Sequence, residues 1–236
     1  MTSHTLNNIS AVSFDLDDTL WDCAPAIIKA EEALYLWLSQ NYPQITQRYS
    51  YTDMHAMRMQ TYKERTDLAS DVTLMRKAFL HTIFSDLLDT DSHVDAAFEF
   101  FYRERSRVEL YEGTHELLTA LGNTYKLAAI TNGNADLELI GLAGYFDDIQ
   151  RATITNLAKP ASDMFVKCCS NLNIDLDRLI HVGDNPQTDV VGARDAGAKT
   201  IWFNNTGAQW PEHLATADFE ANSLAELQTL LLDSFA

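Results

Sequence analysis

The spacing of apolar residues divides the chain into a helical stretch and a stretch in which strands and helices alternate. Ala11–Asp15 (AVSFD) is short and rich in β-branched and aromatic residues, which is typical of a buried strand. From Asp22 to about Arg105 the apolar residues recur at helical spacing, and Pro25 suits a first helical turn. Further helices are predicted here over Met54–Glu64, Val72–Leu88 and Val94–Arg105, the last with Ser92 as its N-cap.

After this helical stretch, short apolar strands alternate with helices. Strands are predicted over Lys126–Thr131, Ile149–Ile154, Leu179–Gly183 and Lys199–Phe203. Helices are predicted over Thr114–Leu121, from Ala135, and over Ser162–Leu172, Pro186–Ala196 and Leu224–Leu232. Such alternation is typical of βαβ units and of a parallel sheet covered on both faces. We therefore expect an α/β protein whose doubly wound, mostly parallel sheet receives an all-helical insert directly after its first strand.

Composition and charge narrow the classes of function. The chain has 236 residues, of which 46% are hydrophobic, so it can bury a sizeable core without disulfides or structural metals. It carries 34 acidic residues against 17 Lys and Arg, a formal net charge of −17. Because nucleic-acid affinity depends mainly on neutralising phosphates, we expect no DNA or RNA partner, and we interpret the charge as a contribution to solubility.

Cysteine use and hydropathy bear on the compartment. The three cysteines, Cys23, Cys168 and Cys169, are odd in number, which predicts no disulfide framework. The first residues lack a basic region followed by an apolar stretch, and no apolar run approaches the ~20 residues needed to span a bilayer. We expect a cytoplasmic protein without a membrane partner; the oligomeric state stays open.

Polar residues of a few chemical types follow the predicted strands. Because ligands of open α/β sheets bind beyond the carboxyl ends of the strands, these positions are the informative ones. They are Asp15, Asp17, Asp18 and Thr19; Thr131, Asn132 and Gly133; Lys159; and Asp184 and Asp189. Singly, each has an ordinary explanation: Asp184 as a turn former or helix cap, Asp189 as an acid in a first helical turn, Lys159 as a solvated side chain. Four strand ends supplying related chemistry together favour a site.

The chemistry that these residue types suit is phosphoryl transfer. Carboxylates of Asp15, Asp17 and Asp184 in one cleft would repel one another, so they could not all stay ionised without a cation. An all-oxygen ligand set suits Mg²⁺, which binds one or two carboxylates together with substrate phosphate. Lys159 offers a compact positive charge and Thr131 a donor, both suited to phosphate oxygens. The expected partner is a small phosphorylated metabolite.

The ordered motifs resemble those of the haloacid dehalogenase superfamily. DLDDTL after the first strand, Thr131 after the second, Lys159, and GDNPQTD after the fourth match its four motifs from about Ile9 to Phe203. The insert resembles the C1 helical cap of the phosphatase-rich subgroup I. The resemblance implies a Rossmann-like catalytic core formed by 1–21 and 107–236, with a helical cap over 22–106.

The resemblance also implies roles for the acidic pair after the first strand. Asp15 would attack phosphorus, form an aspartyl-phosphate and ligate Mg²⁺. Asp17 would protonate the leaving oxygen and then deprotonate water, with its backbone carbonyl on the metal. The dehalogenases of the superfamily lack an aspartate at this position, so Asp17 favours phosphoryl chemistry. For Asp18 we expect backbone hydrogen bonds in the turn and no catalytic part.

The remaining motif residues would hold phosphate and metal. The resemblance implies that Thr131 and the Asn132 backbone bind phosphate oxygens and that Lys159 neutralises phosphate and Asp15. Asp184 would be a metal ligand, with Asp189 supporting the ion directly or through water. Among other candidates, His181 lies inside a strand and is expected to be structural, and Cys168 and Cys169 are expected to be buried small hydrophobes.

Three hypotheses of function remain at this point. The first is a Mg²⁺-dependent phosphatase; the sequence is most similar to bacterial members that act on flavin mononucleotide and on the ribityl-pyrimidine phosphate of riboflavin synthesis, with nucleoside 5′-monophosphates and sugar phosphates as alternatives. The second is a phosphosugar mutase on the same scaffold. The third is a phospho-receiver module, disfavoured because the third strand ends without an acid and receivers lack an insert of this length.

Overall fold

The computed structural model describes residues 8–233, which form two compact units. The first, here the core unit, holds 8–22, 110–133 and 142–233. The second, here the helical unit, holds 23–109 and 134–141. The helical unit thus includes 107–109 and a short segment after the second strand, both outside the expected insert of 22–106. In the described part of the chain, no helix is both long and apolar enough to cross a membrane.

The core unit is built on a six-stranded sheet in which every adjacent pair is parallel. Its strand order is β3-β2-β1-β4-β5-β6. The strands are β1 (Ala11–Phe14), β2 (Lys126–Thr131), β3 (Asp148–Arg151), β4 (Leu179–Gly183), β5 (Lys199–Phe203) and β6 (Phe219–Ala221). The chain therefore builds the sheet outward from β1 in one direction and then, from β4, in the other. This is the doubly wound α/β fold expected from the sequence.

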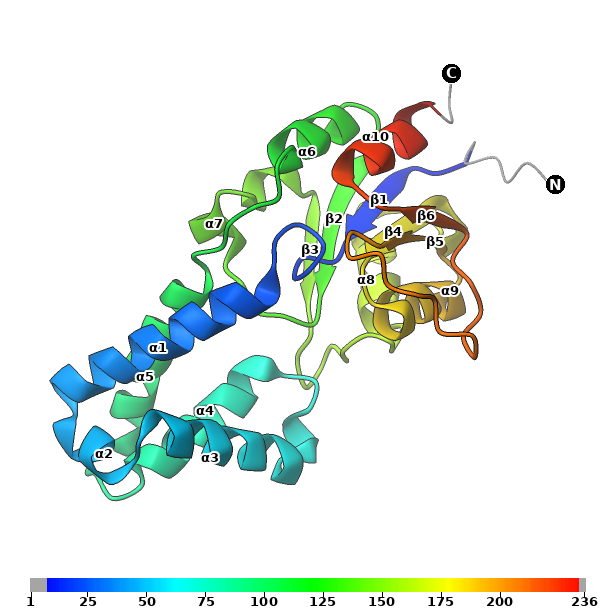
Figure 1. Ribbon diagram of the computed structural model, residues 1–236. Helices are drawn as coiled ribbons and strands as arrows, with labels where there is room; N and C mark the ends of the chain where they lie inside the picture. Colours follow the sequence, from blue (N-terminus) through cyan, green and yellow to red (C-terminus); the bar gives the residue numbers. More distant parts are fainter. Residues whose placement is uncertain (1–7, 234–236) are drawn as a thin grey trace. The chain divides into compact units, whose positions relative to one another are not determined.

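Helices cover both faces of this sheet (Figure 1). One layer contains α8 (Asp163–Leu172) and α9 (Gly192–Ala196), and the other contains α6 (Thr114–Gly122) and α10 (Leu224–Asp233). Strands covered on both sides are nearly continuous apolar runs; all residues of β1 and β4 are buried, and the two polar ones, Ser13 and His181, contact each other. The amphipathic helix α8 buries Phe165, Cys168 and Cys169 in this core, so both cysteines are buried hydrophobes as expected.

The helical unit has its own apolar core. It contains α1 (Cys23–Asn41), α2 (Pro43–Arg48), α3 (Tyr51–Glu64), α4 (Val72–Phe84), α5 (Thr90–Arg105) and α7 (Leu137–Ile140). Helix α5 packs against α1 and α4, and Leu34, Phe79 and Phe101 lie in the shared core. A capping box between Ser50 and Asp53 begins α3.

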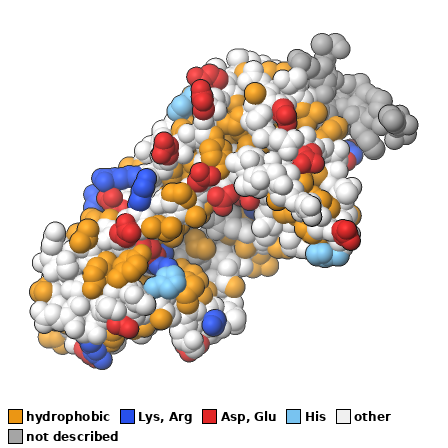
Figure 2. Space-filling view, viewed as in Figure 1, with side chains coloured by type: hydrophobic (Ala, Val, Ile, Leu, Met, Phe, Trp, Pro, Cys, Tyr) orange, Lys and Arg blue, Asp and Glu red, His pale blue; other side chains and the backbone are white. Residues whose placement is uncertain are grey.

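On the face shown in Figure 2, acidic side chains are scattered among white and orange atoms, consistent with charge that serves solubility.

Four local expectations were wrong at the level of element bounds. The third strand begins at Asp148 and ends at Arg151, and α5 begins at Thr90 rather than after Ser92. The helix expected from Ala135 is only α7, one turn long. The helix expected over Pro186–Ala196 begins as a π-helical turn, Pro186–Val191, and only then continues as α9. The edge strand β6 was not predicted, because three residues carry too little periodicity to detect.

Candidate active site

The acidic residues of the first and fourth motifs lie where the strand order reverses. Strand β1 pairs with β4 so that Phe14 lies opposite Val182, and the Asp15 N–H donates to Val182 O at 2.8 Å. Asp15 and Asp184 therefore follow neighbouring strands at the same edge of the sheet. This topological switch point is where open α/β sheets bind their ligands.

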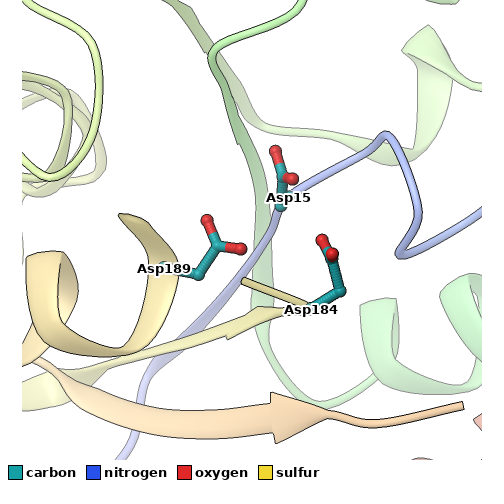
Figure 3. Close-up of side chains that lie close together, drawn as sticks. All are labelled: Asp15, Asp184 and Asp189. Atoms are coloured by element: carbon teal, nitrogen blue, oxygen red, sulfur yellow. The ribbon is translucent and has the colours of Figure 1, made fainter. Parts of the chain in front are cut away.

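A third carboxylate reaches this point from the π-helical turn. Asn185 caps the turn through its side chain, which accepts from the N–H groups of Gln187 and Thr188. Asp189 then faces back, and its Oδ2 accepts the Asn185 N–H at 2.9 Å. One oxygen each of Asp15, Asp184 and Asp189 lies within 4.8 Å of the others. Figure 3 shows the three carboxylates directed into a common space.

Gly183 makes room for Asp189. A Cβ on Gly183 would lie 2.4 Å from both Cγ and Oδ2 of Asp189, far inside van der Waals contact. We therefore expect Gly183→Ala to lower the free energy of unfolding by about 1–3 kcal/mol, the usual cost of overpacking. Urea unfolding measures this, with Gly144→Ala as the matched control because its Cβ would meet nothing within 4 Å. An equal effect of both substitutions would contradict this explanation of Gly183.

Lys159 contacts two of these carboxylates. Its side chain is buried, and its ammonium lies 2.9 Å from Asp15 Oδ1 and 2.7 Å from Asp189 Oδ1. The ammonium also donates to Ile130 O at 2.6 Å. The Asn132 side chain fixes the Lys159 backbone twice, accepting from its N–H at 2.8 Å and donating to its carbonyl at 3.0 Å. Asn132 thus holds Lys159 in place.

The charges of Lys159 and Asp189 stabilise each other. Burial alone lowers the pKa of Lys159, but Asp15 and Asp189 outweigh it and raise that pKa above its usual value. Burial alone raises the pKa of Asp189, but Lys159 and then His181 hold it well below the usual range. At neutral pH the pair is therefore an ammonium and a carboxylate, and its mutual charge is balanced.

Burial dominates at the other two carboxylates. Burial raises the pKa of Asp15 to about 7 against the opposing effect of Lys159, while Asp189 and Asp17 add to the rise. Burial also raises the pKa of Asp184 to about 7, with Asp189 and Asp18 as further causes. Asp15 Oδ1 and Asp189 Oδ1 are buried, and both face the Lys159 ammonium. One ammonium cannot balance three carboxylates whose oxygens lie within 4.8 Å of one another, so the cluster fits a hard divalent cation.

The residues beside this cluster have defined positions. Asp17 does not join the three carboxylates; its Oδ1 accepts from Trp21 Nε1 at 2.8 Å. Thr131 is buried at the end of β2, and its Oγ1 accepts the Gly133 N–H at 2.9 Å. Asp18 has a φ of 60°, and its N–H donates to Trp21 O at 2.7 Å. The backbone of Asp18 therefore closes the turn.

Sequence reasoning missed two residues that contact this site through neighbouring strands. His181 lies opposite Ser13 in the sheet, and Ser13 Oγ is 2.9 Å from its Nδ1 while its Nε2 is 3.6 Å from Asp189 Oδ1. Trp202 lies opposite Gly183, and its Nε1 donates to the Asp184 carbonyl at 2.7 Å. The signal was available only with the strand order, since Ser13–His181 and Trp202–Gly183 are register partners.

A doubly wound sheet with a lysine and three carboxylates at its switch point defines an α/β protein with an acidic, cation-compatible centre. The family model of the haloacid dehalogenase-like hydrolases matches residues 9–197, and the chain belongs to that family.

Known proteins similar to this chain include two phosphatases. One is the 5-amino-6-(5-phospho-D-ribitylamino)uracil phosphatase YigB of Escherichia coli, 32% identical with 96% of this chain and 98% of that protein covered. Another is the human N-acylneuraminate-9-phosphatase, 26% identical with 96% and 95% covered. A solved structure named 2-haloacid dehalogenase, from Pseudomonas syringae, is 33% identical with a TM-score of 0.86 and covers 95% of this chain and 99% of its own. Family membership and the phosphatase relatives make this chain a phosphatase.

Proposed function

We propose that this protein is a Mg²⁺-dependent phosphatase that hydrolyses a small phosphorylated metabolite through an aspartyl-phosphate on Asp15. The observation that carries the proposal is the contact of the buried Lys159 ammonium with Asp15 at 2.9 Å, beside a cluster of three carboxylates that could hold a cation. A lysine and a divalent ion on either side of a carboxylate would together balance the charge of a phosphoryl group. The aspartate at position 17 favours this reading over dehalogenation.

Asp15 and Asp17 carry the covalent chemistry in this proposal. A carboxylate oxygen of Asp15 attacks phosphorus, and the bond from phosphorus to the leaving oxygen breaks while Asp17 gives that oxygen its proton. Asp17 then takes a proton from a water that attacks the aspartyl-phosphate. The bond between phosphorus and Asp15 breaks, which releases inorganic phosphate and restores both carboxyl groups.

The surrounding residues would bind and orient the phosphoryl group. Thr131 Oγ1, which already accepts from Gly133, keeps its own proton to donate to a phosphate oxygen. Lys159 and the Asn132 backbone N–H would neutralise or bind other oxygens. Asp15 and Asp184, with the Asp17 carbonyl, would hold Mg²⁺, and Asp189 would support the ion. The ion, when bound, supplies positive charge that polarises the phosphoryl group.

The substrate is proposed from a relative that this chain matches over nearly its full length. YigB acts on 5-amino-6-(5-phospho-D-ribitylamino)uracil, and 98% of it is covered at 32% identity. We propose that compound first, with flavin mononucleotide, nucleoside 5′-monophosphates and sugar phosphates next. A phosphosugar mutase would use the same aspartyl-phosphate but return the phosphoryl group to the sugar.

The test is a screen of phosphate monoesters with the purified full chain. Inorganic phosphate release is measured with Mg²⁺, with EDTA, and with EDTA followed by excess Mg²⁺. We expect release that EDTA abolishes and excess Mg²⁺ restores, with the highest kcat/KM on a ribityl phosphate. No release above buffer from any ester would overturn the proposal, and isomerised sugar phosphate without free phosphate would favour the mutase.

Trp202 offers a test of the metal assignment. Trp202→Phe keeps an aromatic ring but removes the donor to the Asp184 carbonyl, which loosens the loop that carries this ligand. We expect the Mg²⁺ concentration for half-maximal activity to rise about fivefold, with a loss of about 1 kcal/mol in stability. Trp37→Phe is the control, since Trp37 lies in α1 of the helical unit and its ring stacks on Phe100. Equal effects of the two variants would argue against Asp184 as the ligand.

A further inference from the structure

A cavity of about 320 Å³ lies in the core unit beside Asp184. Its walls come from the turn after β1, from Tyr111, and from the loop after β5. Its size is at the lower end of the range of small-molecule pockets, about 300–1,000 Å³. Asp184 belongs to both the cavity and the carboxylate cluster, so the cavity lies directly beside the proposed phosphoryl site.

One wall is an amide-rich loop with a fixed conformation. Asn204 accepts the Ala208 N–H at 2.8 Å and donates to the Ala208 carbonyl at 3.1 Å, and it also donates to Glu220 at 2.9 Å. These bonds hold the loop closed on itself. The exposed side chains of Asn205 and Gln209, which line the cavity, therefore project from a preorganised backbone.

The cavity is also lined by acidic and aromatic side chains. Tyr111 donates to Asp22, and its ring lies 6.4 Å from that of Phe203. Asp18 and Asp22 add two carboxylates to that of Asp184, and no Lys, Arg or His is among the described residues that line the cavity. Polar contacts there come from amides, hydroxyls and carboxylates alone.

We propose that this cavity is the subsite for the leaving group and that it selects an uncharged, hydroxyl-rich group over one carrying a second anion. The inference rests on the proposed phosphatase function and names its substrate class. Asn205 and Gln209 supply donors and acceptors for hydroxyls, and Asp22 accepts from them. A second phosphate or a carboxylate would meet Asp18 and Asp22, and no cationic side chain among the described residues lines the cavity to offset that repulsion, which disfavours it about tenfold.

Two esters that differ only at one terminus test the charge rule. Sorbitol 6-phosphate ends in an uncharged CH₂OH group where 6-phosphogluconate carries a carboxylate. We expect kcat/KM with Mg²⁺ to be at least tenfold higher for sorbitol 6-phosphate. Asp22→Asn keeps an acceptor for Tyr111 but removes the charge. It should therefore raise kcat/KM for 6-phosphogluconate severalfold and lower the ratio of kcat/KM for sorbitol 6-phosphate to that for 6-phosphogluconate. Asp177→Asn, an exposed aspartate away from the cavity, should leave the ratio unchanged.

Two amide truncations test the recognition of hydroxyls. Asn205→Ala and Gln209→Ala should each raise KM for sorbitol 6-phosphate about fivefold while kcat stays within twofold. Asn123→Ala, an exposed amide that donates to Thr119 O on its own helix, should change neither value.

The outcomes separate the two proposals. The leaving-group subsite alone is overturned if the wild type hydrolyses p-nitrophenyl phosphate but has nearly equal kcat/KM values for sorbitol 6-phosphate and 6-phosphogluconate. It is also overturned if Asp22→Asn leaves the ratio of these two values unchanged. Amide variants that match Asn123→Ala in KM overturn it as well. No release from any ester of the monoester screen, these three included, overturns the phosphatase function, and this inference with it.

Discussion

Asp15→Asn should abolish turnover, with kcat for any accepted monoester reduced by a factor on the order of 10⁴ or more. An amide nitrogen is not a nucleophile toward phosphorus, and the substitution also removes a negative charge from the proposed metal site. The fold should survive, because burial raises the pKa of Asp15 to about 7 and an isosteric neutral side chain is easier to bury there. We expect a melting temperature equal to or above that of the wild type.

Two measurements separate the loss of chemistry from the loss of structure. Phosphate release gives the rate, and thermal unfolding of the same sample shows that the variant is folded. Asp163→Asn is the control, since Asp163 is an exposed aspartate of α8 away from the carboxylate cluster. A folded Asp15→Asn enzyme that retained a tenth of wild-type activity would exclude Asp15 as the nucleophile.

The position of the acidic cluster could be predicted because it depends on local rules. Asp15 and Asp184 each follow a short apolar strand, and parallel strands bring their carboxyl ends to one edge. Periodicity does not predict the strand order β3-β2-β1-β4. Without that order, the residues that lie opposite one another in the sheet could not be predicted either. His181 was expected to be structural because it lies inside a strand; its place opposite Ser13 and beside Asp189 required the sheet.

The π-helical turn shows why local structure at the fourth motif was harder to predict. Pro186 correctly indicated a first helical turn, but the Val190 N–H reaches back to Asn185 O at 3.4 Å, a bond one residue longer than in an α-helix. This wider turn turns Asp189 toward Lys159, where tertiary charge pairing holds it. The sequence pattern therefore identified Asp189, whereas its tertiary contacts determine the backbone conformation of the turn.

The ion pair of Lys159 and Asp189 yields a prediction that separates folding from catalysis. Lys159→Met should leave the Asp189 carboxylate buried without its cation, and removing one partner of a buried pair costs about 3–5 kcal/mol. Adding Asp189→Asn removes that uncompensated charge. The free energy of unfolding of the double variant should therefore exceed that of Lys159→Met by about 2 kcal/mol or more. A coupling of this size is typical of residues in direct contact.

Activity should follow a different order. Phosphate release should be lost in Lys159→Met and in the double variant alike, because neither has the Lys159 ammonium beside Asp15 to balance the charge of the phosphoryl group. Urea unfolding of wild type, both single variants and the double variant gives the coupling free energy, and phosphate release is measured on the same four proteins. If the double variant recovered both activity and stability, Lys159 would serve only to neutralise Asp189. If it recovered stability alone, the Lys159 charge beside Asp15 would be needed for phosphoryl transfer.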